Sequence, residues 1–238
     1  MAVSLKDQVV VVVGASSGIG RETAVLFARE GAKVVASARR EDRLRDLKTQ
    51  VAGIEIFPGD ASRVEDMTAL ADFTKSSYGP ADVLVYATGT NTPDRSTVRL
   101  TPAIWDMMLS VNLNGAYYAT SVFLPEMRSR KAGHLIYISS VSGMVPDVSG
   151  AAYQASKRGL LGLAHAIRVE EKENGIRTCV ICPGLVETEI LEKRPVKPTP
   201  EMLAKALQPI DVAEVVLSIA KLPPRAVVPE IQLLPTLI

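Results

Sequence analysis

Short apolar runs alternate with amphipathic stretches along the whole chain, and this alternation limits the possible folds more than any other feature. The apolar runs, most of them rich in valine and isoleucine, occupy residues 9–13, 32–36, 54–57, 83–86, 135–138, 178–181 and 227–233. Stretches with helical periodicity occupy residues 18–30, 41–51, 64–77, 102–130, 150–174 and 211–221. Buried strands that alternate with helices favour a parallel sheet covered on both faces. We therefore predict a single doubly wound α/β domain over residues 1–238.

The composition limits the classes of function. Hydrophobic residues make up 47% of the 238 residues, and 27 Lys and Arg nearly balance 26 Asp and Glu. A nucleic-acid-binding protein normally carries a strong basic excess, which this chain lacks. Neither an apolar stretch of the ~18 residues that span a bilayer nor the basic start of a signal peptide is found. We therefore expect a cytoplasmic protein that binds neither nucleic acid nor membrane.

Residues 185–209 interrupt the alternation. This stretch contains four prolines and balanced charges, and it follows the end of a predicted strand. Open α/β sheets bind ligands at that edge, and a loop this long is usually functional. We predict a substrate lid here, with a short helix at residues 200–207.

A glycine-rich turn follows the first apolar run and opens the first helix. Gly14, Gly18 and Gly20 give the spacing G-x-x-x-G-x-G between a strand and a helix. Glycine lets the backbone approach a ligand, and a helix N-terminus attracts a pyrophosphate. The same residues also spell G-x-S-x-G around Ser16, as in a hydrolase nucleophile elbow. Their place on the first strand favours a dinucleotide site over a hydrolase, with a turn that binds nothing as the third alternative.

The end of the second strand indicates which dinucleotide binds. Ala38 stands where an NAD site carries an acidic residue, and Arg39 and Arg40 follow. A guanidinium suits the 2′-phosphate of NADP, so we expect a preference for NADPH over NADH of roughly 10- to 150-fold. The alternative is that both arginines only form the solvated start of a helix.

Tyr153 and Lys157 form the candidate catalytic pair. Their spacing of four residues stacks them on one helix face, and an ammonium about 4 Å away would lower the pKa of the phenol by roughly three units. Ser140 follows a predicted strand thirteen residues before Tyr153. Asn112 lies inside a helical stretch where asparagine is unfavourable, which indicates a polar task.

In order and spacing, these motifs and Pro183-Gly184 resemble the short-chain dehydrogenases/reductases over essentially the whole chain. The resemblance implies a Rossmann domain with a seven-stranded parallel sheet, in a homotetramer or homodimer. It implies Tyr153 as general acid/base, Lys157 as the group that lowers its pKa and holds the nicotinamide ribose, Ser140 as the partner of the substrate oxygen, and Asn112 as the holder of a water that links Lys157 to solvent.

The resemblance also implies a set of cofactor-binding residues. Asp60 and Ala61 would contact the adenine, and the residues from Pro183 to Thr188 the nicotinamide carboxamide. The full set is Gly14, Ser16, Ser17, Gly18, Ile19, Gly20, Arg39, Arg40, Asp60, Ala61, Ala87, Gly89, Tyr153, Lys157, Pro183, Gly184, Val186 and Thr188.

One motif departs from the family. Where the family commonly has Asn-Asn-Ala-Gly after the fourth strand, this chain has Tyr86-Ala87-Thr88-Gly89. Only Gly89 keeps its type and place, so the bracing of this turn must come from other groups.

These motifs predict an NADP(H)-dependent oxidoreductase acting on a ketone, an aldehyde or a secondary alcohol. Alternatives within the family are a 3-oxoacyl-carrier-protein reductase and a 3-hydroxy-acid or hydroxy-amino-acid dehydrogenase. An alternative from another class is a non-catalytic NADPH-binding sensor. We expect residues 141–152, residues 90–100 and the lid to line the substrate pocket. Its apolar residues, Met144, Val145, Val148, Leu185 and Ile190, favour a neutral or apolar carbonyl substrate, although Arg95 or Lys193 could move in to meet a carboxylate.

We predict no metal site. Cys179 and Cys182 lie three apart in an apolar strand pattern, where they point to opposite faces. We interpret them as core residues, and His134 and His165 as structural.

Overall fold

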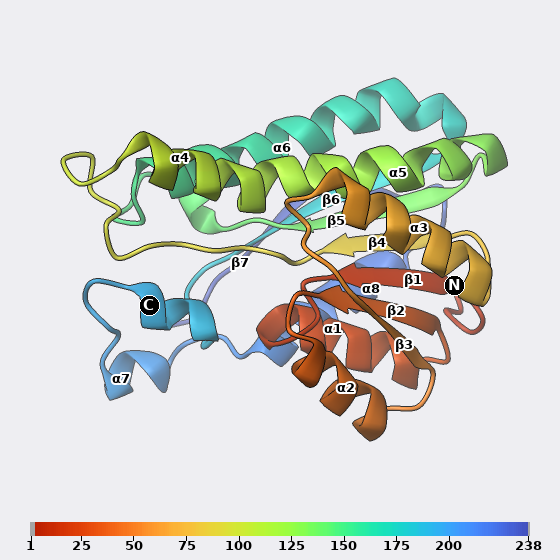
Figure 1. The fold of residues 1–238 in the computed structure, drawn as a ribbon, viewed down its shortest axis with the longest axis horizontal. Helices are drawn as coiled ribbons and strands as arrows, with labels where there is room; N and C mark the ends of the chain where they lie inside the picture. Colours follow the sequence, from red (N-terminus) through yellow and green to blue (C-terminus); the bar gives the residue numbers. More distant parts are fainter. Residues whose placement is uncertain (1–2, 238) are drawn as a thin grey trace.

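The computed structural model describes residues 3–237 and places a sheet of seven parallel strands at the centre of the molecule (Figure 1). The order across the sheet is β3-β2-β1-β4-β5-β6-β7. The strands are β1 (Val9–Val13), β2 (Lys33–Ala38), β3 (Ile54–Pro58), β4 (Val83–Tyr86), β5 (Gly133–Ile138), β6 (Ile176–Pro183) and β7 (Glu230–Leu233). This order is that of the doubly wound Rossmann fold, as predicted.

Helices cover both faces of the sheet. They are α1 (Gly18–Arg29), α2 (Glu41–Gln50), α3 (Val64–Tyr78), α4 (Pro102–Leu109), α5 (Gly115–Arg130), α6 (Ala151–Glu171), α7 (Pro200–Leu203) and α8 (Pro209–Ala220). α1, α2 and α8 pack on one face, whereas α3, α5 and α6 pack on the other (Figure 1).

The valine run of β1 shows why the sequence requires two covered faces. Val10 and Val12 belong to the core under α1 and α8, whereas Val11 and Val13 belong to the core of the opposite face. Side chains along a strand alternate between faces, so a strand covered on both sides needs an apolar residue at every position. All five residues of β1 are buried.

The stretch at residues 102–130, expected as one helix, is divided in the structure. A π-helical turn at Ser110–Asn114 separates α4 from α5. Such a turn inserts extra backbone into a helix and re-aims the side chains within it. Because one such turn leaves no local signature of its own, the sequence pattern did not reveal the interruption.

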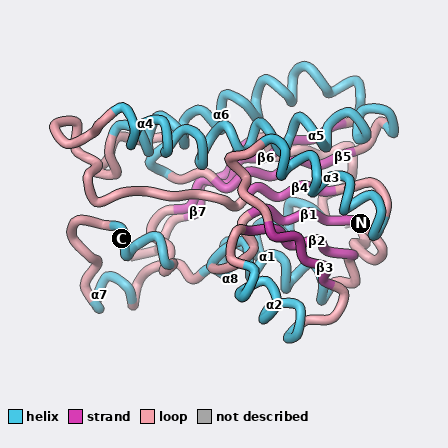
Figure 2. The backbone as a smooth tube through the Cα atoms, viewed as in Figure 1, coloured by secondary structure: helices cyan, strands magenta, loops and turns pink. Residues whose placement is uncertain are grey.

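The carboxyl ends of the strands and their loops meet at one side of the molecule (Figure 2). The predicted lid crosses this side as a 3-10 turn, Glu189–Lys193, followed by α7, which is shorter than the helix expected at 200–207. A bridge between Val186 and Leu207 closes the base of the lid. Within residues 3–237, the helices are all too short or too polar to cross a membrane.

Candidate active site

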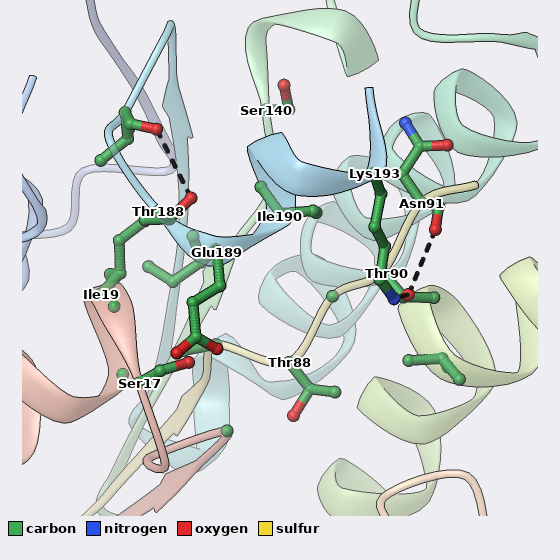
Figure 3. Close-up of a pocket in the computed structure, with 18 of the residues that line it drawn as sticks. Ser17, Ile19, Thr88, Thr90, Asn91, Ser140, Thr188, Glu189, Ile190 and Lys193 are labelled. Carbon is green, nitrogen blue, oxygen red and sulfur yellow. Dashed lines mark hydrogen bonds between the residues drawn. The ribbon is translucent and has the colours of Figure 1, made fainter. Parts of the chain in front are cut away.

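The carboxyl ends of the strands surround a cavity of about 450 Å³ (Figure 3). Its wall contains the glycine turn after β1, the arginines after β2 and the segments after β4, β5 and β6. All residues that the sequence assigned to cofactor binding line this cavity, as do Ser140, Tyr153 and Lys157. Asn112 is not part of the wall.

The glycines of the first turn let two backbone segments approach closely. Gly14 has a φ of 98°, and a Cβ atom there would lie 2.8 Å from the carbonyl carbon of Ala87. A Cβ atom on Gly20 would lie 2.3 Å from the carbonyl oxygen of Gly14. The amino end of α1 therefore reaches the cavity without side chains in the way, and its free N–H groups can hold an anion.

Arg40 forms the side-chain contacts at the end of β2. Its Nη2 atom donates to Ser17 Oγ at 2.7 Å and to Ser16 Oγ at 3.0 Å. Its Nη1 atom forms a 2.7 Å salt bridge with Glu189 of the lid. Arg39 also lines the cavity but is exposed. Two hydroxyls and two guanidinium groups therefore lie together at the β2 end of the cavity.

Tyr153 and Lys157 lie one turn apart on α6, at the other end of the cavity. Desolvation raises the pKa of Tyr153 to about 12, and a hydrogen bond with Ser140 opposes this rise. Lys157 Nζ donates to the carbonyl oxygen of Ile138 at 2.9 Å and lies 5.7 Å from the centre of the Tyr153 ring. Desolvation therefore keeps the phenol protonated in this structure. The expectation that Lys157 lowers the Tyr153 pKa stays a prediction.

The buried position of Lys157 disfavours its charged form. The side chain is buried, and desolvation lowers its pKa to about 8. The backbone around it is fixed, since Ser139 Oγ donates to the carbonyl oxygen of Lys157 at 2.8 Å. A phenol that keeps its proton at neutral pH, beside a serine hydroxyl and an ammonium, can donate that proton to a carbonyl oxygen.

Asn112 lies in the π-helical turn, fully buried behind the cavity wall. Its Oδ1 atom accepts from the Thr90 N–H at 2.7 Å, and its Nδ2 atom donates to the Thr90 carbonyl oxygen and to Ser156 Oγ, both at 3.0 Å. The side-chain amide thus pairs with the backbone of the loop after β4 much as a neighbouring strand would. The polar task expected of a mid-helix asparagine is visible in these contacts.

The unusual Tyr86 braces the turn that lacks the family's asparagines. Its hydroxyl donates to the carbonyl oxygen of Val111 at 2.6 Å, which ties the end of β4 to the π-helical turn. The phenol fits only because residue 115 is glycine, where a Cβ atom would lie 2.3 Å from Tyr86 Oη. The bracing that the sequence left open is therefore supplied by Tyr86 on one side and by Asn112 on the other.

A chain of hydroxyls leads away from Ser140. Ser140 Oγ donates to Ser142 Oγ at 3.1 Å, and Ser142 Oγ donates to Asp147 at 2.5 Å. Asp147 also accepts from the N–H and the hydroxyl of Ser149. Ser142 and Asp147 lie in the segment 141–152 that was expected along the substrate pocket, and both line the cavity. Their hydrogen-bond network was not foreseen, although an aspartate two residues before a serine is a signal for a local turn of this kind.

The substrate side of the cavity is more cationic than expected. Arg95, Lys193 and Arg194 line it, whereas Met144, Val145 and Val148 do not. The predicted apolar wall is therefore only partly present: Leu185 and Ile190 line the cavity, but the loop that carries the other three residues leaves Val148 92% exposed. The sequence indicated Arg95 and Lys193 as cations that could reach the pocket, and both line it. Arg194 was not foreseen, since its position depends on how two distant loops fold together.

The two cysteines and two histidines lie outside this cavity. Cys179 and Cys182 are buried in the cores on opposite faces of the sheet, as predicted. His134 is buried in β5, and His165 lies 3.5 Å from Glu230, a carboxylate partner that the sequence did not indicate. Within the described part of the chain, His, Cys, Asp and Glu side chains form no cluster of three that could hold a metal.

Comparisons with known proteins agree with this architecture. The sequence model of the short chain dehydrogenase family matches residues 8–198. An uncharacterized oxidoreductase from Staphylococcus aureus (strain MRSA252) is 33% identical over 233 residues, which cover 97% of this chain and 98% of the relative.

Solved structures extend the similarity to three dimensions. A metagenomic short-chain oxidoreductase in complex with NADP has a TM-score of 0.84 at 33% identity and covers 98% of this chain and 100% of its own. A serine dehydrogenase complexed with NADP⁺ has a TM-score of 0.87 at 27% identity, covering 95% and 94%. A protein named ribose-5-phosphate isomerase from Brucella melitensis 16M has a TM-score of 0.91 at 26% identity, covering 98% and 93%. Together with the matched residues, these similarities show that the chain is an oxidoreductase of the short-chain dehydrogenase/reductase family.

Proposed function

We propose that the protein is an NADP(H)-dependent oxidoreductase that interconverts a ketone or aldehyde and the corresponding alcohol. The observation that carries this proposal is that Tyr153, Ser140 and Lys157 line the same cavity as the glycine turn and Arg40. A dinucleotide site and a proton donor therefore belong to one continuous space. We also propose that residues 1–238 act as a single domain.

The residues at the β2 end suit NADP(H). The amino end of α1 and the close approach of Gly14 to Ala87 leave room for a pyrophosphate against the backbone. Arg40, backed by Ser16 and Ser17, suits a phosphate on the adenosine ribose, with Arg39 beside it. Two similar structures are NADP complexes, which supports the same choice.

Bound NADP(H) would supply or accept the hydride, and the protein's own residues would manage the proton. Tyr153 would donate its proton to the substrate oxygen in reduction and accept one in oxidation. Ser140 would hydrogen-bond the same oxygen, and the Lys157 ammonium would favour the phenolate form of Tyr153. Asn112, through its contacts with Thr90, would position the loop after β4. The water expected at Asn112 stays a prediction.

A direct test is the oxidation of NADPH and NADH against a panel of carbonyl compounds, followed by nicotinamide absorbance. We expect turnover with NADPH well above that with NADH. Tyr153→Phe should remove turnover while fluorescence titration still shows NADPH binding. Turnover that survives in Tyr153→Phe would overturn the acid/base assignment, and NADPH binding without turnover of any compound would favour the sensor alternative.

A further inference from the structure

Three cations line the substrate side of the cavity without an acidic partner. Arg95, Lys193 and Arg194 form no salt bridge with any of residues 3–237. Arg95 and Arg194 are close enough to Tyr153 for their charges to act on its hydroxyl. The positive charge therefore collects where the substrate must bind.

Arg95 is the most constrained of the three. It is only 9% exposed, and its contacts are with backbone carbonyls: Nε donates to Thr92 at 3.0 Å and Nη2 donates to Lys193 at 2.7 Å. These contacts use two of the five N–H donors of a guanidinium and supply no negative charge. Burial and the nearby Arg194 both lower the Arg95 pKa, so the cation is held at a cost.

The charge of Asp147 acts on Arg95 but offsets the positive charge only in part, since the Arg95 pKa stays lowered. Asp147 lines the same side of the cavity, but its oxygens accept from Ser142 and from two groups of Ser149. Asp147 is exposed, so solvent screens the charge of its carboxylate. Three cations thus face one carboxylate whose oxygens are already hydrogen-bonded.

We propose that the substrate carries an anionic oxyacid group, a carboxylate or a phosphate, that binds Arg95, Lys193 and Arg194 while its carbonyl or hydroxyl group reaches Tyr153. This inference rests on the proposed function and names the substrate class of that site. Guanidinium groups pair with such oxyanions through parallel N–H donors, and the ligand provides the negative charge that the protein lacks. The neutral, apolar substrate favoured by the sequence is replaced by an oxo acid or hydroxy acid, or by its phosphate counterpart.

The negative charge near these three cations could come from the substrate or from the phosphates of the cofactor, and the three residues differ in which of the two they face. Lys193 Nζ donates to Thr90 Oγ1 at 2.6 Å (Figure 3). Burial lowers the Lys193 pKa, and the charge of Arg39 lowers it further, so Lys193 also faces the dinucleotide side. Arg95 and Arg194 lie toward Tyr153. Substitution of Arg194 should therefore weaken the binding of an anionic substrate without affecting the binding of the cofactor phosphates.

The test compares matched carbonyl compounds that differ in charge. Acetoacetate against acetoacetamide gives the carboxylate arm, and dihydroxyacetone phosphate against dihydroxyacetone gives the phosphate arm. In at least one pair we expect kcat/KM for the charged member to exceed that for the neutral member by about tenfold or more. Equal or better use of the neutral member in both pairs would overturn the proposal.

The variants identify the residues responsible. Arg194→Gln should reduce the charged-to-neutral ratio toward one while leaving the Kd for NADPH unchanged. Lys197→Gln is the matched control, because Lys197 carries the same charge on the same lid but pairs with Glu192 outside the cavity. Arg95→Lys is a second variant, which keeps the positive charge but removes the parallel N–H donors of the guanidinium. We expect it to raise KM for the charged compound and to leave KM for the neutral compound unchanged. A ratio that survives in both cavity variants would overturn the proposal.

A binding measurement tests the anion site even if the proposed oxidoreductase activity is not found. If no compound is turned over, the reductase assignment fails for this panel, but calorimetry with acetoacetate or dihydroxyacetone phosphate still tests anion binding to the NADP⁺-saturated protein. Binding of a charged compound that is lost in Arg194→Gln and kept in Lys197→Gln supports the anion site. No binding of either charged compound overturns it.

Discussion

Glu189 and Arg40 are 149 residues apart in the chain, yet a 2.7 Å salt bridge joins their side chains across the mouth of the cavity. Arg43 lies 3.7 Å from the other oxygen of the same carboxylate. Hydrogen bonding with Arg40 lowers the pKa of Glu189, so the carboxylate stays charged there. The 3-10 turn that begins at Glu189 therefore places a negative charge where the proposed 2′-phosphate would bind.

Glu189→Gln should tighten NADPH binding. The salt bridge is about half exposed and contributes about 0–1 kcal/mol, so the gain in affinity should reach up to about fivefold at low salt and shrink at high salt. The Kd for NADH should change less, because NADH lacks the competing phosphate. Fluorescence titration measures both constants. Glu192→Gln, which removes a lid carboxylate that pairs with Lys197, is the control. Weaker NADPH binding in Glu189→Gln would show that Glu189 assists the cofactor instead of competing with it.

Asp147→Asn should shift alcohol oxidation to lower pH. The Asp147 charge raises the pKa of Tyr153, so its removal lowers that pKa, and the phenolate needed for oxidation forms at lower pH. We expect the rising limb of kcat/KM against pH to move down by less than about one unit, because Asp147 is exposed and screened. Asp94→Asn, in the exposed part of the loop after β4, should leave the profile in place. A shift to higher pH in Asp147→Asn would contradict the assignment.

Lys157→Met should stabilise the protein while it abolishes activity. Desolvation lowers the Lys157 pKa from 10.5 to about 8, so the charged form opposes folding at pH 7 by on the order of 3 kcal/mol. The unfolded chain binds more protons between pH 8 and 10.5, so the stability of the natural protein should rise across that window. Denaturant unfolding at pH 7 and pH 10 measures this. Lys172→Met, at the exposed residue that directly follows α6, should change little. Lower stability of Lys157→Met at pH 7 would show that its contact with Ile138 outweighs the charge.

His134 should make the protein sensitive to acid. Burial lowers its pKa from 6.5 to about 3, with Arg177 adding to the effect, and neither ring nitrogen has a hydrogen-bond partner within residues 3–237. The folded protein disfavours the proton that the unfolded chain accepts, so stability should fall by up to about 1.4 kcal/mol per pH unit below pH 6.5. In His134→Leu this part of the slope should disappear from urea unfolding curves between pH 7 and 5. The same slope should persist in His165→Gln, which replaces the half-exposed histidine. Loss of the slope in His165→Gln would contradict its assignment to His134.

The fold was readable from the sequence because its signals are local. β1 and β4 have the predicted bounds, since a run of buried apolar residues between turns leaves little choice. β7 begins at Glu230, three residues after the predicted start, because residues 227–229 continue the apolar pattern while the register with β6 starts only at Glu230. The π-helical turn stayed hidden because it changes the helix spacing by one residue without a local signature.

The candidate site was readable where motifs are short and was hidden where distant loops meet. The glycine turn, Ser140, Tyr153 and Lys157 all reach the predicted cavity. The contacts of Glu189 with Arg40 and of Arg95 with the Lys193 carbonyl join segments 149 and 98 residues apart. No local pattern encodes such a pair, because its geometry follows from the path of the lid over the folded sheet.

Glu189 and Lys193 begin and end one short 3-10 turn. The first contacts Arg40 on the dinucleotide side, and the second contacts Thr90 and, through its carbonyl oxygen, Arg95 on the substrate side. One five-residue turn therefore contacts both sides of the cavity. Any displacement of this segment by one bound molecule must alter the affinity for the other, and thermodynamic linkage makes that influence equal in both directions. The affinity for each of the two ligands should consequently depend on whether the other is bound.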